Sequence, residues 1–234
     1  MPLILNQRDT ESRERMDDPN CDLAELRNTY RQFGSVNRWI GRWQSIYGRY
    51  IAPLAASKDK TTTLLDIGFG GGDIPIALAQ WAERDRLDIA ITAIDPDPRA
   101  YDYVCSLEQA GRVSFRNIDS SRLVKESQKF DIVISNHLLH HLDREEFHQL
   151  LEESKKLSNE RVLFNDIERS DLGYLLFNLL SRPLFRSSFI THDGLTSIRR
   201  SYTLEELREA APADWKVERL FPYRVLLRYD HGQN

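Results

Sequence analysis

A glycine-rich turn flanked by acids is the part of the sequence best suited to chemistry. Residues 66–73 read DIGFGGGD, and the first two of them are the end of an apolar run, residues 63–67, that we expect to be a strand. Glycines at a strand-to-helix turn let the backbone approach a ligand closely and leave helix N–H groups pointing at it. The sequence therefore predicts a ligand site at this turn.

Acids stand at the ends of three successive predicted strands. Asp66 ends the run 63–67, Asp95 follows the run 88–94, and Asp119 follows the run 113–118. The carboxyl ends of parallel strands meet at one edge of a sheet, where open α/β folds bind ligands. We expect these carboxylates to face a ligand that carries ribose hydroxyls and an ammonium group, because a pyrophosphate would be repelled.

Two nucleotide-binding motifs are excluded at this turn. A dinucleotide fingerprint starting at Gly68 would require glycine at position 73, where Asp73 stands. A phosphate-binding Walker loop would require Gly-Lys-Ser or Gly-Lys-Thr, which does not follow.

The elements that must position these residues alternate between short strands and capped helices. Further strands are predicted at 130–135 and 161–165, with helices at 73–83, from Asp97-Pro98 to Gly111, and after a cap formed by Asp143 and Glu146. Such alternation implies a parallel sheet with helices on both faces. A capping box of Thr203 and Glu206 predicts a helix at 204–210, and residues 215–220 and 223–229 predict a terminal antiparallel hairpin.

Two further segments are expected to lie near the site. Residues 1–21 are polar and are expected to be frayed, and residues 22–50 are expected to form a helical cap of two helices, broken at Gly34 and Ser35. Residues 167–202 fit no strand–helix unit and are interpreted as an insertion on the substrate side. No linker or repeat interrupts the chain, so a single domain over residues 1–234 is predicted.

These features resemble the class I S-adenosylmethionine-dependent methyltransferases. The family motif Asp/Glu-x-Gly-x-Gly-x-Gly appears without departure at residues 66–72, and the resemblance covers residues 60–166 and the terminal hairpin. Residues 130–142, FDIVISNHLLHHL, are similar to the fourth-strand motif of small-molecule members, including the quinone-biosynthesis type. The resemblance implies a Rossmann-like, doubly wound α/β sheet of about seven strands, with S-adenosylmethionine as cofactor and S-adenosylhomocysteine as product.

The resemblance also implies which residues hold the cofactor. Asp95 stands where the family's ribose-binding acid stands, and Ile118 with Asp119 looks like the pair that meets the adenine. Amino-methylating members have Asn/Asp-Pro-Pro-aromatic after the fourth strand, whereas Asn136 is followed here by His-Leu-Leu, which disfavours a nucleic-acid base as acceptor. The expected cofactor-binding residues are Asp66, Gly68, Gly70, Gly72, Asp95, Pro96, Ile118, Asp119 and Asn136.

Histidine is the natural general base near neutral pH if the acceptor is a hydroxyl. His137 directly follows the fourth strand and is the first candidate for the catalytic base, with His140 second. No metal site is expected from His137, His140 and His141, because no carboxylate or cysteine is spaced in the sequence to complete one.

The cap and the insertion are expected to determine which acceptor molecule binds. Trp39, Trp43 and Tyr47 of the cap, and Tyr174, Phe177 and Phe185 of the insertion, are predicted to cover the methyl group and line the acceptor pocket. The very apolar stretch 172–180 is explained either by burial in the core or by a place in the wall of a hydrophobic pocket. The expected acceptor is a small hydrophobic or aromatic hydroxylated molecule, with O-methylation favoured and C-methylation as the alternative.

Composition restricts the remaining function classes. The 234 residues carry a net charge of −4, which argues against general binding to nucleic acid. No apolar run reaches the ~20 residues of a membrane span, and the charged N-terminus is no signal peptide, so a cytoplasmic protein is expected. Two other functions stay open: a nicotinamide- or flavin-dependent oxidoreductase, and a non-catalytic binding module on the same fold.

Overall fold

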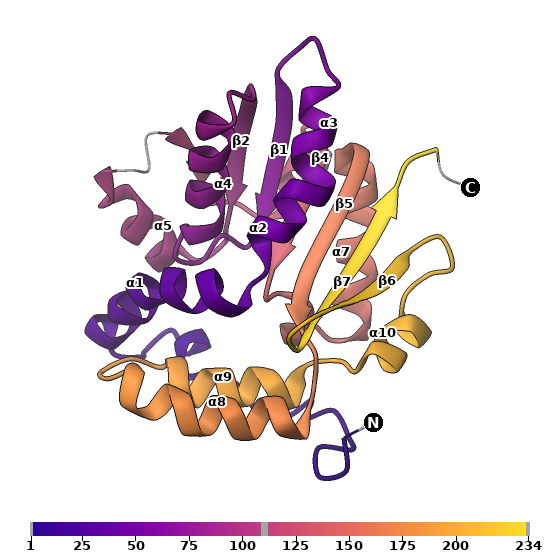
Figure 1. Cartoon of the computed structure of the whole chain (residues 1–234). Helices are drawn as coiled ribbons and strands as arrows, with labels where there is room; N and C mark the ends of the chain where they lie inside the picture. Colours follow the sequence, from indigo (N-terminus) through magenta and orange to yellow (C-terminus); the bar gives the residue numbers. More distant parts are fainter. Residues whose placement is uncertain (1, 109–111, 233–234) are drawn as a thin grey trace.

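A seven-stranded sheet forms the centre of the molecule (Figure 1). The computed structural model describes residues 2–108 and 112–232. The strands lie in the order β3-β2-β1-β4-β5-β7-β6, and only the contacts of β7 with β5 and β6 are antiparallel. The strands are β1 (Thr62–Ile67), β2 (Ile89–Ile94), β3 (Ser114–Arg116), β4 (Phe130–Asn136), β5 (Ser158–Ile167), β6 (Lys216–Leu220) and β7 (Arg224–Asp230).

This topology confirms the predicted doubly wound α/β sheet with its antiparallel terminal hairpin. The chain winds from β1 outward to β3 and then returns to β4 on the other side of β1, so a crevice opens at the carboxyl ends of β1 and β4. Strand β5 extends two residues beyond the predicted end, which brings Asp166 into the sheet.

Helices cover both faces of the sheet and bury alternate strand residues. One face packs on α4 (Asp73–Arg84), α5 (Pro98–Cys105) and the N-terminal helices, and the other packs on α6 (Ser120–Lys125), α7 (Arg144–Leu157) and α10 (Leu204–Ala210). The predicted capping boxes of α7 and α10 are both present. The prediction that Gly111 closes α5 lies outside the described residues, and α5 already ends at Cys105.

The predicted break at Gly34 and Ser35 is wrong, because α1 (Leu23–Ile40) runs through both residues. A mid-helix glycine costs about 1 kcal/mol relative to alanine, which the burial of Leu26 and Tyr30 on the same helix offsets. The helix ends at Gly41, and Arg42 adopts a left-handed conformation with φ of 58°. The chain continues through α2 (Trp43–Ile46), the π-helix η2 (Tyr47–Ile51) and α3 (Ala52–Ala56).

The N-terminal segment, residues 2–21, is packed against the protein rather than frayed as predicted. The N–H groups of Leu3, Ile4 and Leu5 donate to the Asp171 carboxylate, and the Asp9 N–H donates to the Arg199 carbonyl. It contains one short 3-10 helix, η1 (Arg15–Asp17). Its partners lie far away in the sequence, so its polar composition gave no sign that it would be ordered.

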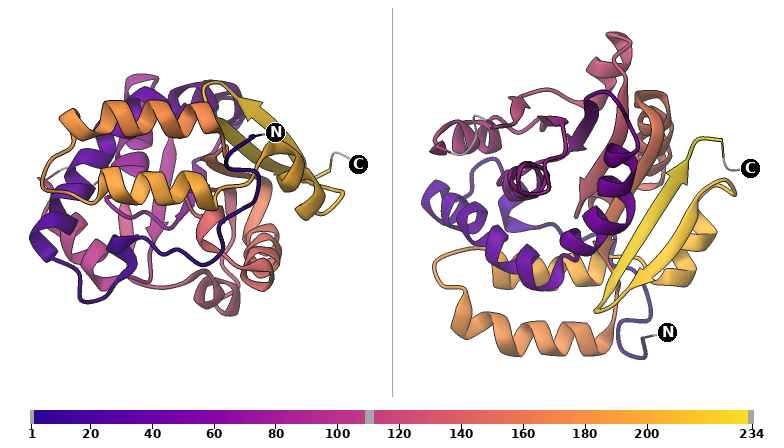
Figure 2. Two further views of the ribbon diagram at one scale, coloured as in Figure 1. Left: turned by 90° about the horizontal axis from the view of Figure 1, so that it is seen from below. Right: turned by 45° about the horizontal axis from the view of Figure 1, so that its top comes forward.

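The insertion forms two helices that lie side by side across the carboxyl ends of the strands, α8 (Asp171–Leu184) and α9 (Ile190–Arg200) (Figure 2). Neither explanation of the apolar stretch holds for its leucines, because they face outward. Between 39% and 68% of each side chain is exposed in Leu172, Leu175, Leu176, Leu179, Leu180 and Leu184. No helix in residues 2–108 or 112–232 is long and apolar enough to cross a membrane.

Candidate functional site

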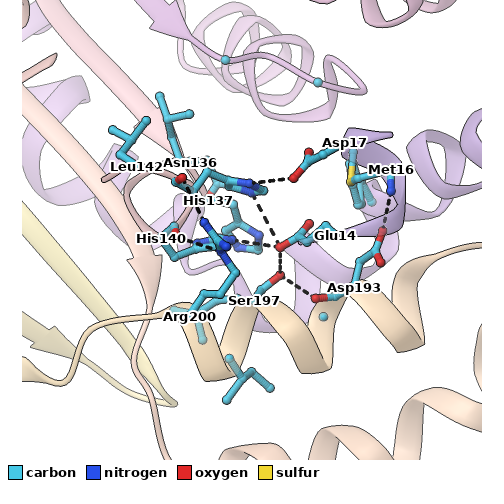
Figure 3. Close-up of a pocket in the computed structure, with 18 of the residues that line it drawn as sticks. Glu14, Met16, Asp17, Asn136, His137, His140, Leu142, Asp193, Ser197 and Arg200 are labelled. Atoms are coloured by element: carbon cyan, nitrogen blue, oxygen red, sulfur yellow. Dashed lines mark hydrogen bonds and ion pairs between the residues drawn. The ribbon is translucent and has the colours of Figure 1, made fainter. Parts of the chain in front are cut away.

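A cavity of about 1240 Å³ lies at the carboxyl ends of β1, β2, β4 and β5. Helix α1 closes it on one side, α8 and α9 close it opposite the strand ends, and the N-terminal segment completes the wall (Figures 1 and 3). Among the predicted site residues it is lined by Asp66, Gly68, Gly70, Asp95, Pro96, Asn136, His137 and His140.

The glycine turn between β1 and α4 forms one end of the cavity. Gly68 and Gly70 line it with positive φ angles of 79° and 50°, which favour glycine. Gly72 has a different role, because a Cβ there would lie 2.7 Å from Cγ1 of Val104. Gly72 therefore permits close packing of the turn on α5 and does not line the cavity.

Asp66 and Asp95 provide carboxylates at this end of the cavity. Asp66 is fully buried, and its Oδ1 has no hydrogen-bond partner among the described residues. Burial, with Asp73 and Asp95 nearby, raises the pKa of Asp66 well above its ordinary value. Asp95 accepts main-chain N–H groups of Gly70 and Asp97 at 2.9 Å each, and burial raises its pKa as well. A cationic or hydroxyl-bearing ligand would relieve both carboxylates.

Asp73, the first residue of α4, contributes a further carboxylate that was not predicted as a site residue. Its Oδ2 accepts a hydrogen bond of 2.9 Å from Nδ2 of Asn37, which ties α1 to the glycine turn. Burial raises the pKa of Asp73 to about 6. Both side chains line the cavity.

Ile118 and Asp119 do not line the cavity. The Asp119 carboxylate accepts the Ser121 hydroxyl at 2.7 Å and the Arg122 N–H at 2.9 Å as it caps α6, and these bonds hold the pKa of Asp119 below its ordinary value. Ile118 packs against the core on the α6–α7 face of the sheet. Their predicted contact with the adenine stays a prediction.

Asn136, at the end of β4, has its side-chain oxygen fully engaged. Oδ1 accepts from Nε1 of Trp43 at 2.9 Å, from the Arg224 guanidinium at 3.0 Å and from the Asn165 amide at 3.2 Å. Arg224 is buried, which lowers its pKa to about 10, and it was not predicted as a site residue. The Asn136 oxygen therefore orders the strand ends, and the predicted contact of Asn136 with the cofactor stays a prediction.

His137 is a poor general base in this geometry. Its backbone is left-handed, with φ of 58°, and its Nε2 accepts a hydrogen bond from the Arg224 guanidinium. Burial and the Arg224 charge lower the pKa of His137 well below its ordinary value. The ring is neutral, and its accepting nitrogen is already engaged.

His140 lies between two carboxylates. Its Nδ1 is 2.7 Å from Oδ1 of Asp166, and its Nε2 is 3.2 Å from Oε1 of Glu14 (Figure 3). Burial opposes the charged ring, but the two carboxylates raise the pKa of His140 to about 9. The His140 charge and hydrogen bond in turn hold the pKa of Asp166 well below its ordinary value, against the effect of burial.

His141 joins the same group of side chains. Its Nε2 is 3.6 Å from Oε1 of Glu14, its Nδ1 is 3.2 Å from Asp17, and Ser197 donates to the same Glu14 oxygen at 2.5 Å. Sequence spacing offered no carboxylate to complete a site with the three histidines, whereas in the structure Glu14 joins His140 and His141 from a segment more than 120 residues away in the sequence.

Two arginines hold the segment that carries these histidines, which consists of the 3-10 helix η4 (Leu139–His141) and Leu142 and is called the histidine loop below. Arg8 donates to the main-chain carbonyls of His140 and Leu142, and Arg200 donates to those of His140 and His141. They fix the loop between the N-terminal segment and α9.

The predicted aromatic cover is largely wrong. Of the six aromatic side chains proposed to line the pocket, only Phe177 does so. Trp39 is 81% exposed, and Trp43 and Tyr47 are buried in the core. The cap instead lines the cavity with Thr29, Phe33, Val36, Asn37 and Ile40.

Sequence reasoning missed Glu14, Asp73, Asp166 and Arg224. One signal was available for Asp166, which follows the predicted fifth strand as Asp95 follows the second. Glu14 carried no such signal, because it stands in a polar segment outside any predicted element.

Comparisons with known proteins identify the family of this core. Residues 64–160 match a family model described as a methyltransferase domain. The plantazolicin methyltransferase BpumL, solved with a monoazolic desmethylPZN analogue and SAH, is 15% identical with a TM-score of 0.55, covering 88% of this chain and 95% of that one. Human N-acetylserotonin methyltransferase, solved with SAM, is 13% identical with a TM-score of 0.60, covering 89% of this chain and 56% of that one.

At these identities the two structures show a shared fold. A comparison with curated protein sequences gives no match. The family match identifies residues 64–160 as a methyltransferase domain, and the sheet order and the glycine turn agree with it.

Proposed function

We propose that this protein transfers a methyl group from S-adenosylmethionine to a hydroxyl group of a small, apolar acceptor. The observation that carries the proposal is the buried Asp66 carboxylate, whose Oδ1 lacks a partner among the described residues, beside the glycine turn and Asp95. A buried carboxylate without a partner costs stability unless a ligand satisfies it. Methyl transfer to carbon is the alternative that the same site would support.

The residues at this end of the cavity fit the cofactor. Asp66 would meet its ammonium group, and the backbone of Gly68 and Gly70 allows its close approach. Asp95, with Pro96, would hold the ribose hydroxyls, since each carboxylate oxygen can accept a second hydrogen bond beyond the main-chain N–H it already holds. When bound, S-adenosylmethionine supplies a methyl group already activated on a sulfonium.

The remainder of the cavity suits the acceptor. Its volume of about 1240 Å³ exceeds the 300–1,000 Å³ of a typical single-ligand pocket, so it has room for both molecules. Phe33, Val36, Ile40 and Phe177 give it apolar walls from α1 and α8. Holding two reactants in line in such a site removes several kcal/mol from a displacement barrier.

The acceptor hydroxyl needs a group that takes its proton. Of the two predicted histidines we assign this to the neutral form of His140, which prevails above its pKa of about 9, because the nitrogen of His137 is held by Arg224. His140 is oriented by Asp166 and reaches Glu14, so the three side chains form a chain that can hold and pass a proton at the cavity wall.

Calorimetric titration with S-adenosylhomocysteine tests the cofactor assignment. Asp66→Asn and Asp95→Ala each remove charge-assisted contacts of about 1.5–3 kcal/mol, so affinity is expected to fall at least about tenfold. Asp102→Asn, an exposed carboxylate on α5, is the matched control and should bind as the unaltered protein does. Asp119→Ala in the same series tests the predicted adenine contact.

Saturation with the ligand should also stabilise the fold. S-adenosylhomocysteine at 100 times its dissociation constant is expected to raise the free energy of unfolding by about 2.7 kcal/mol. No stabilisation by this ligand, together with clear stabilisation by NAD or NADH, would overturn the proposal in favour of an oxidoreductase.

A further inference from the structure

Glu14, His140 and His141 bring three ligand atoms to one point of the cavity wall, and we call them the Glu14 cluster. Oε1 of Glu14 lies 3.2 Å from Nε2 of His140 and 3.6 Å from Nε2 of His141. One ligand atom from each residue can be chosen so that all lie within 4.8 Å of one another. Zinc bonds of about 2.0–2.1 Å in tetrahedral geometry place neighbouring ligand atoms about 3.3–3.4 Å apart, and the 3.2 Å and 3.6 Å between Glu14 and the two histidines lie on either side of that spacing.

The outer partners of the cluster are those that metal-binding histidines have. Nδ1 of His140 contacts Asp166 at 2.7 Å, and Nδ1 of His141 contacts Asp17 at 3.2 Å. A carboxylate on one ring nitrogen fixes the ring and leaves the other nitrogen to bind a metal. Both histidines thus direct Nε2 at the same Glu14 oxygen while Nδ1 is held from behind.

The charge around the cluster also favours a cation. Glu14, Asp17 and Asp166 together bring three carboxylates to two histidines. The nearby Arg8 and Arg200 donate to main-chain carbonyls, and Arg8 donates also to the Tyr202 hydroxyl, so these hydrogen bonds do not go to the three acids.

We propose that Glu14, His140 and His141 bind a divalent transition-metal ion, with Zn²⁺ as the metal that two imidazoles and one carboxylate suit best. Magnesium and calcium prefer oxygen ligands throughout, so two imidazoles disfavour them. Three protein ligands leave at least one coordination position, and the cluster lines the cavity, so that position faces the acceptor side.

The catalytic role of the metal rests on the proposed function, whereas the binding of the metal does not depend on that function. An acceptor hydroxyl on the open position would lose its proton more readily, because a bound cation lowers the pKa of a coordinated oxygen. The proton-accepting role given to His140 above then belongs to the metal-free protein.

The test uses the full chain, stripped with EDTA and titrated with Zn²⁺ or with Co²⁺ as a spectroscopic probe. One equivalent of either metal is expected to bind, and Co²⁺ should give the visible absorption bands of nitrogen and oxygen coordination. Glu14→Gln and His141→Asn should weaken binding at least about 100-fold, and Asp17→Asn about 10–100-fold, as outer partners do.

Matched controls are His148→Asn and Glu11→Gln, which change a histidine and a glutamate outside the cluster and should bind the metal as the unaltered chain does. Circular dichroism verifies that each variant is folded, and Asp17→Asn keeps all three ligands if Glu14→Gln proves unstable. Less than one tenth of an equivalent bound by the unaltered chain, or equal affinity in Glu14→Gln, would overturn the proposal.

Titration of the metal-free chain with S-adenosylhomocysteine separates the two proposals. Cofactor binding without metal binding would overturn the proposed metal site and support the methyltransferase function. Metal binding without cofactor binding would support the metal site and overturn the proposed methyltransferase function.

Discussion

Local charge decides what each side chain of the cavity can do. His137 and His140 are three residues apart and both buried, yet their pKa values shift in opposite directions. His137 faces the Arg224 guanidinium, whereas His140 lies between Asp166 and Glu14. Burial disfavours charge on both rings, so the neighbouring charges determine the difference.

Asp73 provides a prediction at this scale, because its pKa is raised to about 6 by burial. An acid whose pKa is raised on folding contributes fully to the stability of the folded protein when the pH is below its pKa in the unfolded chain. This contribution is lost as the pH rises through its pKa in the folded chain. Replacing Asp73 with Asn removes this loss and keeps an acceptor for Asn37. The free energy of unfolding should then rise at pH 7.5 by about 1–2 kcal/mol. This value follows from the raised pKa and is reduced because the Asp73 side chain is partly exposed to solvent.

Urea unfolding of Asp73→Asn between pH 4 and pH 8 measures this effect. The gain should shrink toward zero near pH 4, where Asp73 is protonated in the folded chain. Asp102→Asn is the control and should follow the unaltered protein at every pH. A gain of the same size at pH 4 and pH 7.5 would contradict the pKa argument.

At the scale of elements, close approach between helices shapes the cavity. Gly194 of α9 lies under the ring of Phe177 of α8, and a Cβ at Gly194 would come within 2.4 Å of that ring. Phe177 and Gly194 both line the cavity, whereas the leucines of α8 are exposed on the outside.

Gly194→Ala tests this contact. Alanine favours the helix by about 1 kcal/mol, but overpacking costs about 1–3 kcal/mol, and at this distance we expect the overpacking to dominate. Thermal unfolding should show a net loss in Gly194→Ala and recovery in the double variant with Phe177→Leu. Gly48→Ala is the control, since nothing lies within 4 Å of a Cβ there, and it should be neutral or stabilising.

The N-terminal helices are part of the core and not a separable lid. Trp43 is 2% exposed and donates to Asn136, whereas Trp39 is 81% exposed. Trp43→Ala should therefore lower the free energy of unfolding by about 3–5 kcal/mol, and Trp39→Ala should change it by less than about 0.5 kcal/mol. Chemical denaturation of the two variants measures this, and equal losses would contradict the assigned burial.

At the scale of the whole molecule, the N-terminal segment joins distant parts of the chain around the cavity. Arg8 donates to the Arg200 carbonyl at 2.6 Å, to the Tyr202 hydroxyl at 2.9 Å, and to the carbonyls of His140 and Leu142. One side chain thus connects the first residues to the end of α9 and to the histidine loop.

Arg8→Ala leaves these acceptors without a charged donor. Hydrogen bonds to charged groups contribute about 1.5–3 kcal/mol, so we expect a loss of about 2–3 kcal/mol in the free energy of unfolding. Arg13→Ala, an exposed arginine in the same segment, should stay within about 0.5 kcal/mol of the unaltered chain. Urea denaturation measures both, and a neutral Arg8→Ala would mean that the segment does not stabilise the loop.

The strands, the glycine turn and the acids beside that turn could all be recognised in the sequence. These features are local, because a glycine turn, a strand and the acid that follows it are consecutive in the chain. Periodicity and turn chemistry act over a few residues, so they can be recognised from spacing. For this reason Asp66, Gly68, Gly70 and Asp95 were predicted together and line one cavity.

The side chains around the histidines, at the other end of the cavity, could not be recognised in this way. Glu14 reaches His140 across 126 positions of sequence, and Arg224 reaches His137 across 87. Neither pairing leaves a pattern in either local segment, because a hydrogen bond depends on where the elements pack and not on their spacing in sequence. The same physical reason explains why Trp39 and the leucines of α8, apolar and helical, lie on the surface while a polar N-terminal segment lines the cavity.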